Sequence, residues 1–260
     1  MALIKTTEEI AILREGGKIL SSALGDVLRS AKDGSLMSDL DKLAEEAIRR
    51  YGATPSFLNY KVGKGPAFPA TVCISKNSEV VHGPGNRNII LKEGDIVGFD
   101  IGCWFEGMCT DMAYTIGIGN VSEQVRSLMN VTKASLKNGI SAAKSGSKLQ
   151  AISQAVEDTV KPHGYGIVRI YTGHGVGHEV HEDPRVPNFV STEFKNPELK
   201  EGMVLAIEPM IALGSPDLET AEDGWTAITV DGSIAAHFEQ TIVITANGSE
   251  ILTPWPTDYE

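Results

Sequence analysis

The sequence predicts an α+β fold in which a mainly antiparallel sheet is covered on one face by helices. Helical and strand-like segments alternate along the 260 residues, in the order helices, strands, helices, strands. The strand-like segments, 71–118 and 165–252, are rich in Val, Ile and Thr and are broken up by Gly and Pro. Because no stretch has the composition of a linker, we expect one compact domain over residues 1–260.

Four segments have apolar residues at helical spacing. The first opens with Thr6-Thr-Glu-Glu9, a capping-box pattern, and its apolar positions continue to Leu28. The other three helices are expected at residues 38–51, 122–143 and 149–161.

The two helical pairs resemble each other, which suggests two pseudo-symmetric halves of the chain, about 1–118 and 119–260. Amphipathic helices of unrelated origin would share part of the pattern through their period alone, so the duplication is a hypothesis. The matching positions fall without a gap: Gly34-Ser35, Glu45 and Gly52 in the first pair, and Gly146-Ser147, Glu157 and Gly164 in the second.

Charge and cysteine content exclude several classes of protein. A formal net charge of -11 disfavours binding to nucleic acid or to anionic membrane surfaces. Cys73, Cys103 and Cys109 form no C-x-x-C pair and are odd in number, so a secreted disulfide framework is not expected. Neither a signal peptide nor a membrane span is apparent, and a cytoplasmic protein is the simplest interpretation.

A β-hairpin that turns at Glu106-Gly107 is predicted between residues 94 and 116. With a two-residue turn, Gly102 faces Asp111 across the hairpin. Asp100 is two residues from Gly102 on the same strand, so Asp100 and Asp111 share one face as diagonal neighbours. Two carboxylates would therefore converge.

No local cation is available to this pair, because neither Lys nor Arg occurs between Glu93 and Val125. From the hairpin alone, two solvated aspartates on a sheet surface are the more common arrangement. If the pair is buried, however, its charge must be neutralised, and a metal ion would do so.

Two further carboxylates strengthen the metal hypothesis. Glu208 and Glu239 are predicted to lie inside otherwise apolar strands, at residues 203–210 and 235–244. Residues 201–260 contain no Lys or Arg, so ion pairing would have to come from elsewhere in the chain or from a metal. Four isolated carboxylates in two halves of the chain indicate one shared site.

Three histidines, His174, His178 and His181, lie within residues 173–184, where the glycines disfavour a helix. Oxygen ligands with one imidazole suit Mn, Fe or Co and fit poorly with the Cys-rich tetrahedron of structural zinc. Two bridged metals could hold a hydroxide for attack on a carbonyl group.

Four short motifs resemble those of the type I methionine aminopeptidases, which have the "pita-bread" (creatinase/aminopeptidase) fold. The similarity extends from about Ile4 to Ile251 and implies a single catalytic metallopeptidase domain with pseudo-twofold duplicated halves. The motifs are Glu-Val-Val-His-Gly around His82, Gly-His-Gly around His174, His-Glu-Asp-Pro at His181 and Ile-Glu-Pro-Met at Glu208.

The resemblance implies a site for two divalent ions, of Co, Mn, Fe or Zn. Glu208 would also be the general base, His82 would contact the substrate near its amino group, and His181 would hydrogen-bond the scissile carbonyl. The implied metal ligands are Asp100, Asp111, His174, Glu208 and Glu239.

The implied activity is removal of the N-terminal methionine from new proteins whose second residue is small, by metal-activated hydroxide attack on the first peptide bond. The partners would be nascent chains at the ribosome, in the cytoplasm, and the enzyme would be a monomer. Aromatic and sulfur surfaces suit a thioether, and the implied methionine pocket consists of Tyr60, Phe68, Cys73 and Trp225.

This chain departs from the common family pattern at a few positions. Residues 61–67 lengthen the interval before Phe68, Val180 replaces a frequent aromatic, and Gln240 stands where many members have histidine. Residues 1–7 contain no zinc-binding extension, and the interval from His181 to Glu208 is too short for the insertion of type II enzymes. Three histidines match no catalytic position and are assigned to structure or surface: His163, His178 and His237.

Three other functions remain to be separated from this one. A proline-specific peptidase of the same fold typically has a sizeable additional N-terminal domain. A catalytically inactive binding module of this fold would have lost its ligands, whereas all five are present. Another oxygen-rich metal hydrolase would share the site but lack the thioether pocket.

Overall fold

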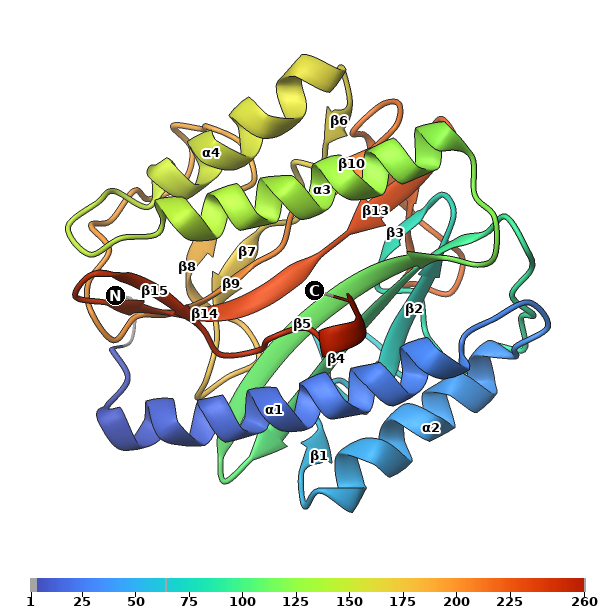
Figure 1. The fold of residues 1–260 in the computed structure, drawn as a ribbon, viewed down its shortest axis with the longest axis horizontal. Helices are drawn as coiled ribbons and strands as arrows, with labels where there is room; N and C mark the ends of the chain where they lie inside the picture. The colour runs from blue at the N-terminus through green and yellow to red at the C-terminus, as the bar shows by residue number, and fades with distance from the viewer. Residues whose placement is uncertain (1–3, 64, 260) are drawn as a thin grey trace.

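The computed structural model describes residues 4–63 and 65–259, so residues 1–3 of the N-terminal segment and Lys64 of the 61–67 segment lie outside it. Its four α-helices lie on the same side of the strands (Figure 1). The three later helices begin and end within one residue of the predicted bounds. The helices are α1 (Thr7–Ser30), α2 (Met37–Arg50), α3 (Glu123–Ala142) and α4 (Gln150–Val160).

The predicted capping box at the start of α1 is confirmed. The Thr6 side chain accepts a hydrogen bond from the Glu9 backbone N–H, and the Glu9 carboxylate accepts one from the Thr6 N–H at 2.7 Å. Two backbone donors that the helix leaves free are thereby satisfied.

The strands form a large curved sheet in which every pairing is antiparallel, as predicted. Its main path runs in the order β1-β4-β5-β14-β9-β7-β8, and β2 and β15 pair with β4 and β14. These strands are β1 (Thr54–Pro55), β2 (Val72–Lys76), β4 (Ile96–Phe105), β5 (Met108–Gly117), β7 (Gly173–Gly175), β8 (Glu182–Val186), β9 (Val204–Ile207), β14 (Glu239–Thr245) and β15 (Gly248–Ile251).

Two three-stranded sheets complete the fold, in the orders β13-β10-β6 and β11-β12-β3. Within the described ranges, no helix is both long and apolar enough to cross a membrane. The strands of the two small sheets are β3 (Glu79–Val81), β6 (Gly166–Ile167), β10 (Met210–Ala212), β11 (Leu218–Thr220), β12 (Ala227–Thr229) and β13 (Ala235–His237).

The large sheet joins two parts of the chain that have the same element order, two helices followed by strands. The junction is the pairing of β5 with β14, where Glu239 lies opposite Ala113. The boundary near residue 118 and the single-domain organisation stay predictions.

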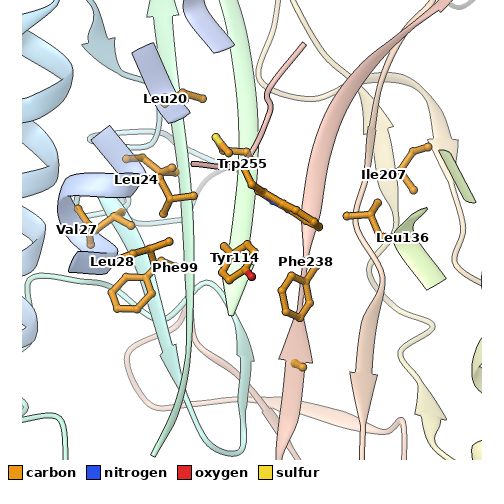
Figure 2. Packing of buried hydrophobic residues seen from close by; sticks show 14 of the residues in the cluster. Leu20, Leu24, Val27, Leu28, Phe99, Tyr114, Leu136, Ile207, Phe238 and Trp255 are labelled. Atoms are coloured by element: carbon orange, nitrogen blue, oxygen red, sulfur yellow. The ribbon is translucent and has the colours of Figure 1, made fainter. Parts of the chain in front are cut away.

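The hydrophobic core is continuous across this junction (Figure 2). Leucines of α1 pack toward Phe99 of β4, and beside them Tyr114 meets two aromatic side chains from the second half of the chain. Its ring centroid lies 5.0 Å from that of Phe238 and 5.1 Å from that of Trp255, both edge to face. Such pairs stabilise by about 0.5–1.5 kcal/mol beyond the area that they bury.

Helix α1 approaches the C-terminal segment most closely at Gly17. A Cβ atom at this position would lie 1.8 Å from the backbone oxygen of Leu252, a distance that requires the backbone to move. We expect Gly17→Ala to destabilise the protein by about 1–3 kcal/mol or more, although alanine is the better helix former. Urea unfolding measures the effect. The exposed Ser22→Ala in the same helix is the control, and equal stability of the two variants would contradict the close approach.

Candidate metal centre and active site

The predicted β-hairpin is confirmed, and it brings the two aspartates together. β4 and β5 connect through Glu106-Gly107, both of which have positive φ, and Gly102 pairs with Asp111. Asp100 pairs with Ala113, two positions further along the hairpin, so Asp100 and Asp111 are diagonal neighbours. The carboxyl groups of Asp100 and Asp111 are close enough for each to shift the pKa of the other.

The prediction that Glu208 lies inside a strand is wrong, whereas Glu239 does lie in a strand, although the predicted strand at residues 235–244 is broken at Phe238. Glu208 follows the end of β9, and the next strand, β10, belongs to a different sheet. Glu239 is the first residue of β14, and Phe238 separates it from β13. Both carboxylates thus lie where the chain passes between the β13-β10-β6 sheet and the large sheet. After Glu208, Pro209 favours the end of the strand because it has no N–H to donate.

The crossing places ligand atoms from several elements within a few ångströms of one another. Two groups of three residues could each hold a metal ion, and Glu239 belongs to both groups. Within each group, every residue offers one ligand atom, and the three atoms lie within 4.8 Å of one another. The groups are Asp111, His174 and Glu239, and Glu208, His237 and Glu239.

The four carboxyl groups are buried together, and desolvation is the main cause that raises the pKa of each. For Asp111, Glu208 and Glu239, the charge of neighbouring carboxylates raises the pKa further. Burial raises the pKa of Asp100 to about 7, and it holds the others well above their ordinary values. Within residues 4–63 and 65–259, no Lys or Arg side chain forms an ion pair with any of them.

Several polar atoms of this cluster are buried without a hydrogen-bond partner among the described residues. They include Oδ1 of Asp100, Oδ1 of Asp111 and Oε1 of Glu239. Unpaired buried oxygens cost about 1–3 kcal/mol each, and more when they are charged. Divalent cations would supply both the missing partners and the missing positive charge, so the residues present fit a metal site.

The imidazole of His174 leaves one ring nitrogen free to bind a metal ion. Its Nδ1 lies 2.8 Å from the Gly175 carbonyl oxygen, which can only accept, so Nδ1 carries the proton. Nε2 is left with a free lone pair, 3.4 Å from Oε1 of Glu208. Desolvation lowers the pKa of His174 to about 3, which keeps the ring neutral and able to ligate.

His181 and His82 flank this cluster. The His181 ring lies 4.4 Å from the His174 ring, and its Nδ1 is 2.8 Å from the Tyr60 hydroxyl. His82 has a φ of 63° and packs edge to face on Tyr171, with 4.9 Å between ring centroids. Desolvation lowers the pKa of both histidines, that of His82 to about 4.

A cavity of about 530 Å³ opens onto these groups. Part of the cavity wall was not predicted from the sequence: Ile170 and Tyr171 lie in a segment without a motif, and Arg185 directly follows the His-Glu-Asp-Pro motif but was not singled out. The predicted site residues that line it are Asp100, Asp111, His174, Glu208, Glu239, His82, His181, Tyr60, Phe68 and Trp225.

The predicted methionine pocket is assembled in part. Phe68 and Trp225 meet edge to face at 5.2 Å, beside Tyr60. Cys73 packs in the same hydrophobic cluster but does not line the cavity, and burial raises the pKa of its thiol well above its usual range. Val62, from the 61–67 segment, reaches the cavity and is 60% exposed, so this segment forms part of the entrance.

The structure adds a residue that sequence analysis assigned to structure or surface. His237 is 3% exposed, and its Nε2 lies 3.8 Å from both Glu208 Oε2 and Glu239 Oε2. Its position two residues before Glu239 was the only available signal. Gln240 points away from the cluster and donates to the Thr253 carbonyl oxygen at 3.2 Å.

The loop that carries His181 is fixed by a buried ion pair with the N-terminal segment. The amino group of Lys5 lies 2.7 Å from the carboxylate of Glu182, and both side chains are almost fully buried. The same carboxylate accepts hydrogen bonds from the backbone N–H groups of His178, at 2.5 Å, and Glu179, at 3.1 Å. Glu182 therefore holds the turn that precedes His181.

We expect Lys5→Met to destabilise the protein by about 3–5 kcal/mol, because it leaves the Glu182 carboxylate buried without its cation. Thermal unfolding measures the change. The control is Arg14→Met, which removes a half-exposed ion pair with Glu250 from the same end of the chain and should cost no more than about 1 kcal/mol. Equal losses in the two variants would contradict a special role for the buried pair.

Comparison with known proteins places this geometry in a family. The model of metallopeptidase family M24 matches residues 11–246. The methionine aminopeptidase of Clostridium acetobutylicum is 44% identical over 253 residues, which cover 97% of this chain and 99% of that protein.

Solved structures of methionine aminopeptidases have the same fold as this chain. The methionine aminopeptidase of Thermotoga maritima superposes with a TM-score of 0.91 at 40% identity, over 97% of this chain and 99% of that chain. The prolidase of Pyrococcus furiosus is more distant, with a TM-score of 0.78 and 26% identity, and the match covers 66% of its length.

Proposed function

This chain belongs to metallopeptidase family M24 and, within it, to the type I methionine aminopeptidases, and we propose that its substrates are new polypeptides with a small second residue. It is a hydrolase with the pita-bread fold that removes N-terminal methionine from nascent chains. The observation that carries the substrate proposal is the position of the buried carboxylate cluster at one end of a cavity with an aromatic wall.

The family requires divalent metal, and we propose that two ions bind here. Asp100, Asp111, His174, Glu208 and Glu239 would hold them. Co, Mn, Fe and Zn all accept this mixture of oxygen ligands and imidazole. When bound, the ions supply a Lewis acid that lowers the pKa of water, so that hydroxide is available to attack the first peptide bond.

Glu208 is the proposed general base. Its carboxylate lies in the cavity, beside the Nε2 atoms of His174 and His237, and is not engaged by Lys or Arg within the described ranges. A carboxylate in this position can take a proton from the attacking water and deliver it to the leaving amine. Burial, and then the charge of Asp100, raise the pKa of Glu208 well above its ordinary value, and bound cations would lower it.

His181 and His82 are proposed to act on the substrate. The Tyr60 hydroxyl at 2.8 Å fixes the His181 ring, which leaves Nε2 to face the cavity as a donor to the scissile carbonyl and its developing oxyanion. His82, held against Tyr171, would contact the substrate near its amino group. Removing one such oxyanion donor typically costs about 10²–10³ in kcat.

The methionine side chain is proposed to occupy the space beside Tyr60, Phe68 and Trp225, where aromatic rings make favourable contacts with sulfur. Cys73 packs in the same hydrophobic cluster as these rings and does not line the cavity. A cavity built around the first peptide bond leaves little room for a large second residue, which is the basis of the proposed preference.

We propose a cytoplasmic, monomeric enzyme that meets its substrates as they leave the ribosome. The three cysteines are free and buried, which fits a reducing compartment. The acidic net charge gives no support for nucleic acid as a partner.

The proposal is tested with the metal-free enzyme reloaded with one type of ion at a time. Met-Ala-Ser should be hydrolysed, whereas Met-Leu-Ser, peptides with a different first residue and Xaa-Pro peptides should react at least about tenfold more slowly. Free methionine is the measured product. Faster cleavage of Xaa-Pro peptides would favour the proline-specific alternative, and no methionine release with any metal would overturn the proposal.

A further inference from the structure

His237 is a buried imidazole that none of the proposed catalytic steps uses. Its side chain is 3% exposed, and its Nε2 has no hydrogen-bond partner among the described residues. The backbone around it is fixed, because its N–H donates to the Thr115 hydroxyl at 3.1 Å and its carbonyl accepts from that hydroxyl at 2.5 Å. The unpartnered nitrogen is therefore held in place.

This nitrogen faces two carboxylates at distances that do not suit a direct hydrogen bond. Nε2 is 3.8 Å from Oε2 of Glu208 and 3.8 Å from Oε2 of Glu239, whereas N–H···O bonds span roughly 2.7–3.2 Å. Two ligands of one ion, each at about 2.0–2.2 Å from it, lie roughly 3–3.6 Å apart, so the spacing is close to that of a shared metal.

We propose that His237 is a metal ligand, and that it binds the same ion as Glu208 and Glu239. The proposal rests on the two-ion site described above and adds a sixth ligand to it. Asp111, His174 and Glu239 form the other group of neighbouring ligand atoms, so each ion would have one imidazole and both would share Glu239.

This arrangement has a consequence for metal selectivity. An imidazole raises the affinity of a carboxylate site for Co²⁺, Ni²⁺ and Zn²⁺ more than for Mn²⁺. The ion bound by His237 should therefore discriminate against Mn²⁺, and this discrimination should depend on the imidazole.

The test is equilibrium dialysis and calorimetric titration of metal-free protein with Co²⁺ and with Mn²⁺. The unmodified protein should bind two Co²⁺ ions. His237→Gln should weaken the binding of one of them by at least about tenfold, with a smaller change for Mn²⁺. His163→Gln, which removes an imidazole stacked on Tyr165 outside the cavity, is the matched control and should change neither.

A second measurement reports on the ligand directly. In the NMR spectrum of the fully Co²⁺-loaded protein, two contact-shifted imidazole resonances are expected, and His237→Gln should remove one. Thermal unfolding of the metal-free variants identifies a variant that fails to fold, and in that case the spectrum of the unmodified protein still decides the question.

The possible failures can be told apart. If the unmodified protein binds a single ion, the two-ion site is wrong. The unmodified protein could instead bind two ions but show only one contact-shifted imidazole. If His237→Gln then binds both ions as tightly as the unmodified protein, His237 is not a ligand, and only this inference is wrong.

Discussion

Glu208→Gln is expected to lower kcat for Met-Ala-Ser by about 10²–10⁴ while the protein keeps much of its bound metal. Glutamine has the same size and retains one oxygen ligand, but it cannot accept and return a proton at neutral pH. Initial rates at saturating peptide give kcat, and elemental analysis of the dialysed variant gives its metal content.

The control for this substitution is Glu219→Gln, which changes the net charge equally at an exposed position of β11. It should leave both kcat and metal content unchanged. Unaltered turnover of Glu208→Gln at full metal content would show that Glu208 takes no part in the proton transfers. If the variant loses all its metal, the lower kcat reports the role of Glu208 as a metal ligand instead.

The metal-free protein is expected to lose stability as the pH rises from 6.5 to 8, by about 1.4 kcal/mol per pH unit for each cluster carboxyl that is still protonated. Burial raises the pKa of Asp100 to about 7 and those of Asp111, Glu208 and Glu239 well above their ordinary values. In this interval the folded state binds more protons than the unfolded state, so each increase in pH favours unfolding.

The interval begins at pH 6.5 because histidines act in the opposite direction below it. Burial lowers the pKa of His174 and His237 to about 3, so the unfolded chain takes up their protons below about pH 6.5 and partly cancels the effect of the carboxyls. Above that value the unfolded-state histidines lose their protons over about one pH unit, so their opposing effect fades and the carboxyls dominate the slope.

With metal bound, the slope should be close to zero, because ligand carboxylates are already deprotonated in the folded state. Urea unfolding at several pH values, with and without saturating Mn²⁺, measures both slopes. Asp111→Asn should reduce the slope of the metal-free protein, and Glu219→Gln should not. Parallel curves with and without metal would show that the carboxyls do not bind the ion.

Local patterns were sufficient for the helices and for the central hairpin. The capping box at Thr6 and Glu9 depends on residues three apart, and the two-residue turn at Glu106-Gly107 fixes the register of β4 and β5. Because these interactions are short in sequence, the diagonal placement of Asp100 and Asp111 followed directly.

Composition was sufficient to indicate the metal. The lack of Lys and Arg near all four carboxylates in the sequence meant that their burial would require either a cation from a distant part of the chain or a bound metal. The family motifs then assigned separate roles to Glu208, His82 and His181, which no spacing argument from one sequence supplies.

The tertiary structure alone decided how the second half contributes. Glu208 and Glu239 lie at breaks where the chain leaves one sheet for another, and such breaks depend on pairing between segments distant in sequence. The same crossing turns His237 toward the carboxylates. The sequence by itself thus predicted which residues would hold a metal, whereas long-range strand pairing decided which side chains meet where the sheets cross, because a side chain's direction is set by the strand that carries it and by the partners of that strand.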